Sequence, residues 1–328
     1  MYNITLKNGK TFSCDSDTTI FDAALKANIT LEHSCLKSRC KSCAVRVISG
    51  KTENIENELV LSEEELKQNF VLSCNAKPIS DLSLNVEDLG NIKFFDKKIV
   101  PAKINLIERI RSNVIKLTLR LPPTCNFQFN SGQYINLIKD NIKRSYSIAN
   151  SNNTNQLEFF IDKYEKGLMS KYLFEDAQIN DLLRIEGPLG SFFLRESKYK
   201  NIIFLATGTG IAPIKSILDN ILEVSNDYSK HIFWLFIGAK FEDDILWHPE
   251  ISDDKICINY IPVLSQQSGW TGQKGYVQNA VLKEEINLEN SQVYACGSSN
   301  MINDAKQTLI KNSLMEDNFF SDVFTESN

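Results

Sequence analysis

The chain has 328 residues, a length that predicts two to three domains, and its 42% hydrophobic and 23% charged residues are ordinary for a globular protein. Its net charge of −5 and its pI near 5.5 argue against a general binder of nucleic acid or of anionic membranes, because both functions need a basic face. The N-terminus has no signal-peptide pattern, and no apolar run approaches the roughly 18 residues that a membrane span requires. We therefore expect a cytoplasmic protein with no nucleic-acid partner and no membrane partner.

Residues 1–90 predict a small α+β domain, with two strands and a short helix before a cysteine-rich loop and further strands after it. Asp17 or Thr18 is expected to cap the first helix. Ser62, with Glu65 three residues later, predicts a capping box at the start of a second helix.

Residues 91–98 are expected to be a linker that leads into two further domains. Residues 99–197 contain short strands separated by turn residues, a pattern that is typical of an antiparallel barrel. Residues 198–328 alternate buried strands with helices, which indicates a parallel α/β sheet. Two helices of this last domain are expected to begin near Pro213 and Met301.

Four of the eight cysteines lie between positions 35 and 74. Cys35, Cys40 and Cys43 have the spacing C-x4-C-x2-C, and Cys74 follows after thirty residues, which is the spacing of plant-type 2Fe–2S ferredoxins. In a chain without a signal peptide such clustering favours a metal centre over disulfides. A structural zinc site and unligated thiols are the alternatives, although the sequence offers only one of the closely spaced pairs that zinc sites use.

Residues 1–90 resemble plant-type ferredoxin domains, a resemblance that implies a β-grasp fold with these four cysteines as cluster ligands. The family usually has glycine where this chain has Ser38 and Lys41. A non-glycine residue at positive φ costs about 1 kcal/mol, so we expect a strained or slightly reshaped loop. A cluster-free, non-catalytic binding subunit is an alternative of another class, and these two residues are its only support.

Two motifs in the barrel segment point to a flavin. In the first, Arg144 can neutralise a diphosphate, Tyr146 offers a flat ring beside an isoalloxazine, and Ser147 offers a hydroxyl near flavin N5. In the second, Gly167 precedes a helix whose N-terminal N–H groups can hold a pyrophosphate. An ordinary set of barrel turns is the alternative. The candidate FAD-binding residues are Arg144, Ser145, Tyr146, Ser147, Gly167, Met169 and Ser170.

A glycine-rich loop over residues 207–213 follows a buried strand and opens a helix, the context in which a dinucleotide approaches the backbone. Cys296 follows a later strand and is expected to line the same site, with a buried small hydrophobe as the alternative reading. The candidate nucleotide-binding residues are Thr207, Gly208, Thr209, Gly210, Ala212, Pro213, Gly238, Cys296 and Gly297.

These motifs, in this order, resemble the ferredoxin–NADP reductase superfamily. The order ferredoxin, FAD barrel and nucleotide domain occurs in reductases of multicomponent oxygenases and in CDP-6-deoxy-3,4-glucoseen reductases, which serve 3,6-dideoxyhexose biosynthesis. Residues 183–188, 293–298 and 319–324 are most similar to the second group.

The resemblance implies that electrons pass from NADH through FAD to a 2Fe–2S cluster and then to a partner protein. In the glucoseen reductases the partner is a pyridoxamine-phosphate, iron–sulfur dehydrase, and the C3 oxygen of the sugar is removed. Ser147 and Cys296 would hold the geometry of hydride transfer, and Phe324 would cover the flavin until the nicotinamide displaces it. An oxygenase as the electron acceptor is the main alternative.

The segment after Gly238 bears on the choice of nucleotide. Lys240 stands where the superfamily often has arginine, and three acidic residues follow from Glu242 to Asp244. The acidic stretch would repel a 2′-phosphate, so we expect NADH rather than NADPH, although Lys240 argues the other way.

Overall fold

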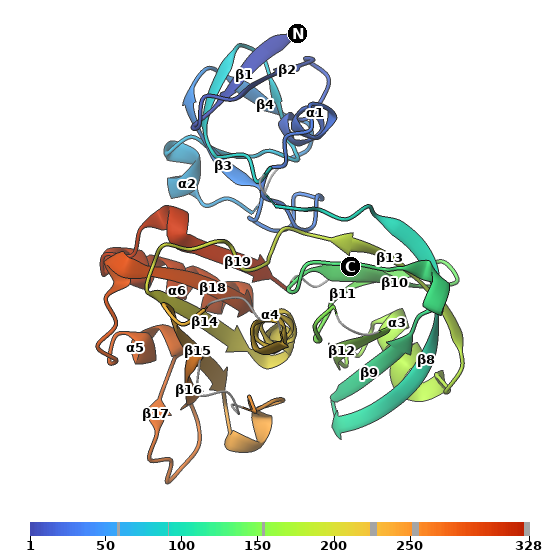
Figure 1. Ribbon diagram of the computed structural model, residues 1–328. Coiled ribbons are helices and arrows are strands. Elements are labelled where there is room, and N and C mark those ends of the chain that lie inside the picture. The colour runs from blue at the N-terminus through green and yellow to red at the C-terminus, as the bar shows by residue number, and fades with distance from the viewer. Residues whose placement is uncertain (58–59, 91, 153–154, 224–227, 251–255, 325–328) are drawn as a thin grey trace. The chain divides into compact units, whose positions relative to one another are not determined.

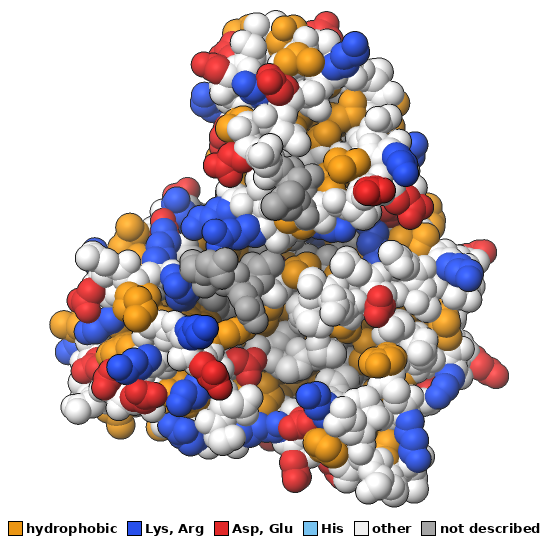
Figure 2. Space-filling view, turned by 180° about the vertical axis from the view of Figure 1, so that it is seen from behind, with side chains coloured by type: hydrophobic (Ala, Val, Ile, Leu, Met, Phe, Trp, Pro, Cys, Tyr) orange, Lys and Arg blue, Asp and Glu red, His pale blue; other side chains and the backbone are white. Residues whose placement is uncertain are grey.

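A computed structural model describes residues 1–57, 60–90, 92–152, 155–223, 228–250 and 256–324 (Figure 1). Backbone contacts divide the chain into two units, Met1–Phe94 and Phe95–Asn328. The finer boundaries drawn from the sequence between three domains and a linker stay predictions. Basic and acidic side chains are interspersed over the face drawn in Figure 2. Among the described residues, no helix combines the length and the apolarity needed to cross a bilayer.

The first unit is a five-stranded mixed sheet covered by helix α1, which is the β-grasp fold expected from the sequence. Strand β1 pairs in parallel with β7, while the other pairs of this sheet are antiparallel. The sheet order is β2 (Thr11–Cys14), β1 (Tyr2–Leu6), β7 (Leu82–Asn85), β3 (Ala44–Ser49) and β5 (Phe70–Leu72). A small second sheet pairs β4 (Thr52–Asn54) with β6 (Ala76–Pro78), and the helices are α1 (Ile20–Lys26) and α2 (Glu63–Lys67).

The N-cap residue predicted from the sequence is confirmed for α2 but not for α1. Thr19 caps α1, rather than Asp17 or Thr18, and its hydroxyl accepts a hydrogen bond from the N–H of Asp22 at 3.0 Å. The sequence offers three successive polar residues here, and the backbone path selects the last of them. The capping box of α2 is confirmed, with its reciprocal bonds between Ser62 and the third helical residue.

The second unit begins with a six-stranded antiparallel barrel that confirms the fold expected for its first half. Strands β11 and β12, at the two ends of the strand order, contact each other and close the barrel. The order is β11 (Ile142–Ser147), β10 (Tyr134–Lys139), β13 (Leu182–Leu189), β8 (Lys98–Arg111), β9 (Val114–Arg120) and β12 (Gln156–Asp162). A short helix, α3 (Leu168–Lys171), and a π-helical turn, η2 (Tyr172–Asp176), follow β12.

A parallel six-stranded sheet forms the rest of the second unit, as the continuous apolar strands predict. Its order is β17 (Gln273–Lys274), β16 (Cys257–Leu264), β15 (Ile232–Ala239), β14 (Asn201–Thr207), β18 (Ser291–Gly297) and β19 (Phe319–Val323). The helices are α4 (Ile211–Glu223), α5 (Val277–Val281) and α6 (Ser299–Lys311). Helices α4 and α6 each begin two residues before the starts expected at Pro213 and Met301. Helix α4 begins earlier because proline is tolerated in the first turn of a helix. Helix α6 begins earlier because Ser298 is its N-cap, where the hydroxyl accepts a hydrogen bond from the Met301 N–H.

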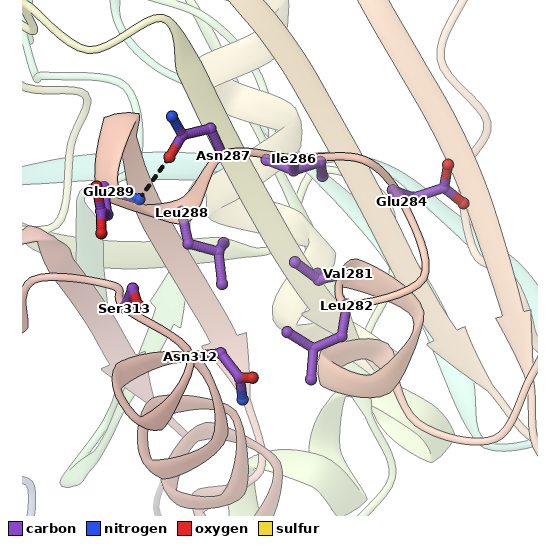
Figure 3. A pocket seen from close by; sticks show the side chains of 9 residues that line it. All are labelled: Val281, Leu282, Glu284, Ile286, Asn287, Leu288, Glu289, Asn312 and Ser313. Atoms are coloured by element: carbon purple, nitrogen blue, oxygen red, sulfur yellow. Dashed lines mark hydrogen bonds between the residues drawn. The ribbon is translucent and has the colours of Figure 1, made fainter.

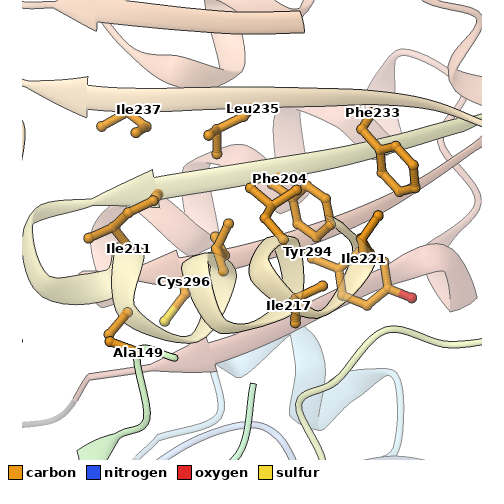
Figure 4. Packing of buried hydrophobic residues seen from close by; sticks show 14 of the residues in the cluster. Ala149, Phe204, Ile211, Ile217, Ile221, Phe233, Leu235, Ile237, Tyr294 and Cys296 are labelled. Carbon is orange, nitrogen blue, oxygen red and sulfur yellow. The ribbon is translucent and has the colours of Figure 1, made fainter. Parts of the chain in front are cut away.

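The barrel and the parallel sheet share one hydrophobic core. Ala149 of the barrel lies in the same buried cluster as Ile211 and Ile217 of α4 and Tyr294 of β18 (Figure 4). Phe160 of β12 belongs to this cluster as well. Each fully buried large apolar side chain contributes about 1.5–3 kcal/mol to folding. This common core fixes the barrel against the edge of the sheet where the glycine-rich loop lies.

Candidate functional site

The four clustered cysteines lie as two adjacent pairs. Cys43 Sγ is 3.3 Å from Cys74 Sγ, and the thiols of Cys35 and Cys40 are hydrogen-bonded to each other. A disulfide would bring the sulfurs to about 2.05 Å, so Cys43 and Cys74 are free thiols. Cys40 and Cys43 are separated by only two residues, so the two pairs meet in the same loop. Two pairs of thiols fit a cluster of two irons, in which each iron takes two cysteine ligands.

The cysteine loop directs its N–H groups at the sulfurs. The Lys37 N–H donates to Cys35 Sγ and the Cys35 N–H donates to Cys40 Sγ, each at 3.4 Å. The hydrogen bond with Cys40 and the N–H groups of Lys37, Arg39 and Cys40 outweigh burial and lower the pKa of Cys35 to about 5. The hydrogen bond with Cys43, aided by the N–H and hydroxyl of Ser38, lowers the pKa of Cys74 to about 7. The same thiol–thiol hydrogen bonds raise the pKa of Cys40 and of Cys43, so each pair favours one sulfur, Cys35 or Cys74, as the anion that iron ligation needs.

The two departures from the family's glycines behave differently. Ser38 has a φ of +54° and Leu36 a φ of +50°, so the expected strain is present in this loop. Lys41 is not among the described residues with positive φ. Its Nζ instead lies 2.6 Å from Glu65 Oε2, at the start of α2. Only the first of the two positions demands the glycine conformation.

The first flavin motif occupies β11, and α3 lies against this strand. Ser147 is buried at the end of β11, and burial raises the pKa of Tyr146 well above its usual value. Arg144 Nη1 donates to the Lys143 carbonyl at 2.8 Å, and the Ser145 hydroxyl donates to an amide oxygen of β10 at 2.8 Å. Arg144 and the half-buried ring of Tyr146 therefore share one face of a barrel strand that ends at the buried Ser147, which fits the residues expected to contact FAD.

The second flavin motif begins α3, as the sequence predicts. Gly167 is the N-cap, and a Cβ there would lie 3.2 Å from the Cβ atoms of both Ser170 and Tyr164. The Ser170 hydroxyl accepts from the Tyr164 N–H at 2.8 Å, which folds the loop back on the helix start. Met169 is 1% exposed within the barrel core, so only its backbone can reach a cofactor.

The candidate nucleotide residues meet at the carboxyl edge of the parallel sheet. Strand pairing puts Thr207 of β14 beside Gly238 of β15, and Ala206 beside Cys296 of β18. A Cβ on Gly210 would lie 2.4 Å from the Cys296 carbonyl oxygen, so close packing of the loop requires glycine there. Ala212 and Pro213 are buried in the first turn of α4.

Gly208 and Gly297 both have positive φ at this edge of the sheet, but only at Gly297 would a side chain also collide with protein atoms. Gly297 has a φ of +147°, and a Cβ there would lie 2.2 Å from Thr207 Oγ1. Gly208 has a φ of +55°, and a Cβ there would meet no protein atom within 4 Å. A positive-φ residue that borders open space at a helix N-terminus fits the close approach of a dinucleotide.

Cys296 and Phe324, which are expected to act in hydride transfer, both lie at the carboxyl end of β18. Cys296 is fully buried in the shared core, and burial raises the pKa of its thiol well above the usual value. The N–H of Phe324 donates to the Gly297 carbonyl at 3.1 Å, which holds this half-buried ring beside the carboxyl end of β18. Their roles in hydride transfer stay predictions.

Two residues at the end of the barrel contact the nucleotide loops and were missed by sequence reasoning. Thr209 Oγ1 donates to Asp162 Oδ2 at 2.9 Å, and Arg111 forms an ion pair with Asp244. Neither Arg111 nor Asp162 belongs to a recognisable motif, so no local signal could have found them.

A pocket at the opposite end of the parallel sheet holds none of these candidates. It lies between Leu282, Leu288 and Asn312, near the start of β18 and the ends of α5 and α6 (Figure 3). The carboxyl edge of the sheet and the barrel strands beside it are therefore the candidate site of the second unit, and the cysteine loop is a separate candidate site in the first unit.

Comparison with known proteins gives the class and then the family. Three family models match in chain order: a 2Fe-2S iron-sulfur cluster binding domain over residues 4–78, an oxidoreductase FAD-binding domain over residues 101–194, and an oxidoreductase NAD-binding domain over residues 204–307. These matches and the fold define an iron–sulfur flavoprotein oxidoreductase. The chain belongs to the family that contains CDP-6-deoxy-L-threo-D-glycero-4-hexulose-3-dehydrase reductases and the reductase components of oxygenases.

The chain is 40% identical to the CDP-6-deoxy-L-threo-D-glycero-4-hexulose-3-dehydrase reductase of Yersinia pestis, over 98% of this chain and 97% of the relative. It is 32% identical to the phenol hydroxylase P5 protein of Acinetobacter pittii, over 99% and 94% of the two chains. Its fold matches the ferredoxin reductase of carbazole 1,9a-dioxygenase with a TM-score of 0.66 at 22% identity, over 99% and 98% of the two chains.

The sequence-based assignment to this family and to this fold is thereby confirmed. The protein passes electrons from a nicotinamide nucleotide through FAD to a 2Fe–2S cluster and on to a partner protein.

Proposed function

We propose that the electron acceptor is a pyridoxamine-phosphate, iron–sulfur dehydrase acting on a CDP-linked 6-deoxy-4-hexulose. The chain would thereby support removal of the C3 oxygen in 3,6-dideoxyhexose biosynthesis. The observation that carries this proposal is the 40% identity to the Yersinia pestis reductase along nearly the whole of both chains. The phenol hydroxylase relative, at 32% identity, supports an oxygenase as the second candidate acceptor.

We infer that Cys35, Cys40, Cys43 and Cys74 hold the cluster, supported by their pairing and by the N–H groups directed at their sulfurs. When bound, FAD converts two-electron hydride chemistry into the one-electron transfer that the cluster can carry. The chain's own contribution is positioning: Ser147 lies buried at the end of β11, and the glycine-rich loop would hold the nucleotide.

Replacement of Cys74 by Ser separates the two halves of the electron path. The variant should keep NADH-to-ferricyanide activity, because this reaction needs only the flavin and the nucleotide. It should lose reduction of the partner and the low-temperature EPR signal, with average g below 2, that NADH elicits in the wild type. Full partner reduction by Cys74→Ser would overturn the proposed ligand set.

We propose NADH rather than NADPH as the donor. Glu242 and Asp243 are exposed just after β15, where they would repel a 2′-phosphate, whereas the charge of Asp244 is compensated by Arg111. Lys240 is also exposed and acts in the opposite direction, so the expected preference is modest. A higher kcat/KM for NADPH than for NADH would refute this proposal.

The acceptor is tested by reconstitution. The purified reductase, the dehydrase and the CDP-linked hexulose are mixed, and NADH oxidation is followed with and without the sugar. Sugar-dependent NADH oxidation supports the proposal. The matched control replaces the dehydrase with a phenol hydroxylase and its substrate, and faster turnover in that mixture would favour the oxygenase alternative.

A further inference from the structure

Arg111 and Asp162 lie side by side at one end of the barrel. Arg111 is the last residue of β8 and pairs with Val114 of β9, while Asp162 is the last residue of β12 and also pairs with Val114. Directly opposed residues of antiparallel strands project from the same face. The guanidinium and the carboxylate therefore flank Val114 on a common face of the sheet.

Each of these residues holds one loop of the nucleotide sheet. The Asp162 carboxylate accepts from the hydroxyl of Thr209, in the glycine-rich loop after β14, at 2.9 Å. Arg111 pairs with Asp244 in the loop after β15, and Asp244 Oδ2 also accepts from the Phe241 N–H at 3.1 Å. Strands β14 and β15 are neighbours and run in parallel, so these two loops leave the same edge of the sheet side by side.

The guanidinium partly offsets the negative charge at this end of the barrel. Asp162 and Asp244 bring two carboxylates to the edge where the anionic diphosphate would bind, and Arg111 forms an ion pair with Asp244 and acts electrostatically on Asp162. Burial raises the pKa of Asp162, although the Thr209 hydrogen bond and Arg111 oppose the rise. Arg111 is itself only 19% exposed, so solvent screens its interactions weakly.

We propose that Arg111 is a positioning residue for the nicotinamide nucleotide: it fixes both bordering loops and offsets the two carboxylates that would otherwise repel the diphosphate. The nucleotide must lie at the carboxyl edge of the sheet, as proposed above, for this role to operate. The contact extends from the FAD barrel to the nucleotide domain, so the barrel takes part in nucleotide affinity as well as in flavin binding.

The test measures binding of ADP-ribose, which carries the diphosphate but no reducible ring, to the FAD- and cluster-loaded protein by calorimetry. Arg111→Met should raise the Kd by about tenfold or more, because two carboxylates are left uncompensated. KM for NADH should rise in parallel, with little change in kcat. Arg109→Met is the control, since Arg109 is on the same strand but its side chain donates to the carbonyls of Ser112 and Phe174.

Asp162→Asn separates a charge effect from a purely structural one. Asparagine keeps an oxygen that accepts from Thr209 but removes the negative charge, so the Kd for ADP-ribose should fall severalfold. A merely structural role would not produce tighter binding. A Kd for Arg111→Met within twofold of the wild type, or unchanged or weaker binding by Asp162→Asn, overturns the proposal. Neither measurement involves the electron acceptor, so such a failure leaves the proposed partner untouched.

Discussion

Lys41 Nζ lies 2.6 Å from Glu65 Oε2, so the cysteine loop is tied to the first turn of α2. The same carboxylate oxygen accepts from the Ser62 N–H at 2.7 Å and completes the capping box. Both side chains of the ion pair are roughly a quarter exposed, at 27% and 28%. One carboxylate thus joins the loop that carries three of the cysteines to the helix that follows it.

Replacement of Glu65 by Gln should loosen the cysteine loop. The variant loses the ion pair with Lys41 while keeping an oxygen for the helix cap, so the expected loss of stability is about 0.5–1 kcal/mol. The measurement is the rate of iron release to a chelator, together with urea unfolding of the loaded protein. We expect faster release for Glu65→Gln.

Glu63→Gln is the matched control for this prediction. Glu63 lies in the same acidic first turn of α2, so its replacement removes a charge near the helix N-terminus but leaves the Lys41 pair intact. Equal acceleration of iron release in both variants would mean that the helix charge, and not the contact with the loop, protects the cluster.

Ser38 introduces backbone strain but also donates hydrogen bonds to the Cys74 sulfur, and two substitutions separate these effects. Its φ of +54° costs roughly 1–2 kcal/mol, while its N–H and hydroxyl are directed at the Cys74 sulfur. Ser38→Gly should raise the stability of the first unit, because glycine removes the strain. Ser38→Ala keeps the strain and should not.

Both Ser38 variants lose the hydroxyl that donates to the Cys74 sulfur. Hydrogen bonds to the sulfurs favour the more negative, reduced cluster, so both variants should have a more negative reduction potential than the wild type. A redox titration followed by EPR gives this potential. An unchanged potential in Ser38→Ala would show that the backbone N–H alone tunes the sulfur.

The sequence predicted most where the signal was local or strongly periodic. The spacing of Cys35, Cys40, Cys43 and Cys74 predicts their convergence, because the ligand geometry itself sets that spacing. Continuous apolar strands gave the parallel sheet, and short alternating ones gave the barrel. These features arise from patterns that span only one element or one loop.

The contacts that escaped prediction join distant parts of the chain. Asp162 lies 47 residues from Thr209, and Arg111 lies 133 residues from Asp244. Neither residue stands in a motif, and an aspartate at a strand end is equally compatible with a solvated turn. Only the packing of the barrel against the parallel sheet gives these side chains a role.

Two glycines of the nucleotide loop should respond differently to alanine. In Gly210→Ala the new Cβ would lie 2.4 Å from the Cys296 carbonyl, so the backbone must shift at a cost of about 1–3 kcal/mol. In Gly208→Ala the Cβ meets only open space, and the cost is the left-handed conformation, about 1 kcal/mol.

Nucleotide binding should also distinguish Gly208→Ala from Gly210→Ala. If the open space beside Gly208 receives the nucleotide, Gly208→Ala should weaken ADP-ribose binding more than its small loss of stability accounts for. Thermal unfolding and calorimetric binding are measured on both variants. Wild-type affinity in Gly208→Ala would place the diphosphate elsewhere along the edge.

Glu186 of β13 should make the stability of the barrel depend on pH. Its side chain, 12% exposed, contacts Lys143, accepts from the Asn136 amide at 2.9 Å and lies 3.5 Å from Lys97. The hydrogen bond with Lys143, opposed by burial, holds the pKa of Glu186 below its usual value of about 4.3. The contribution of a carboxylate with a depressed folded pKa is complete above that value and is lost as the pH falls through the folded pKa.

Urea unfolding of the wild type and of Glu186→Gln between pH 7 and pH 3.5 tests this dependence. At pH 7 the variant should be less stable by about 1 kcal/mol, because it keeps the Asn136 bond but loses both lysine contacts. The difference should narrow as the pH falls below the usual glutamate pKa and through the lower pKa of Glu186, where the wild-type carboxylate protonates. Glu175→Gln is the control, since its pair with Lys163 is 3.5 Å long and exposed, and its removal should cost little at any pH. A difference for Glu186→Gln that stays constant down to pH 3.5 would mean that packing, and not charge, is the contribution of Glu186.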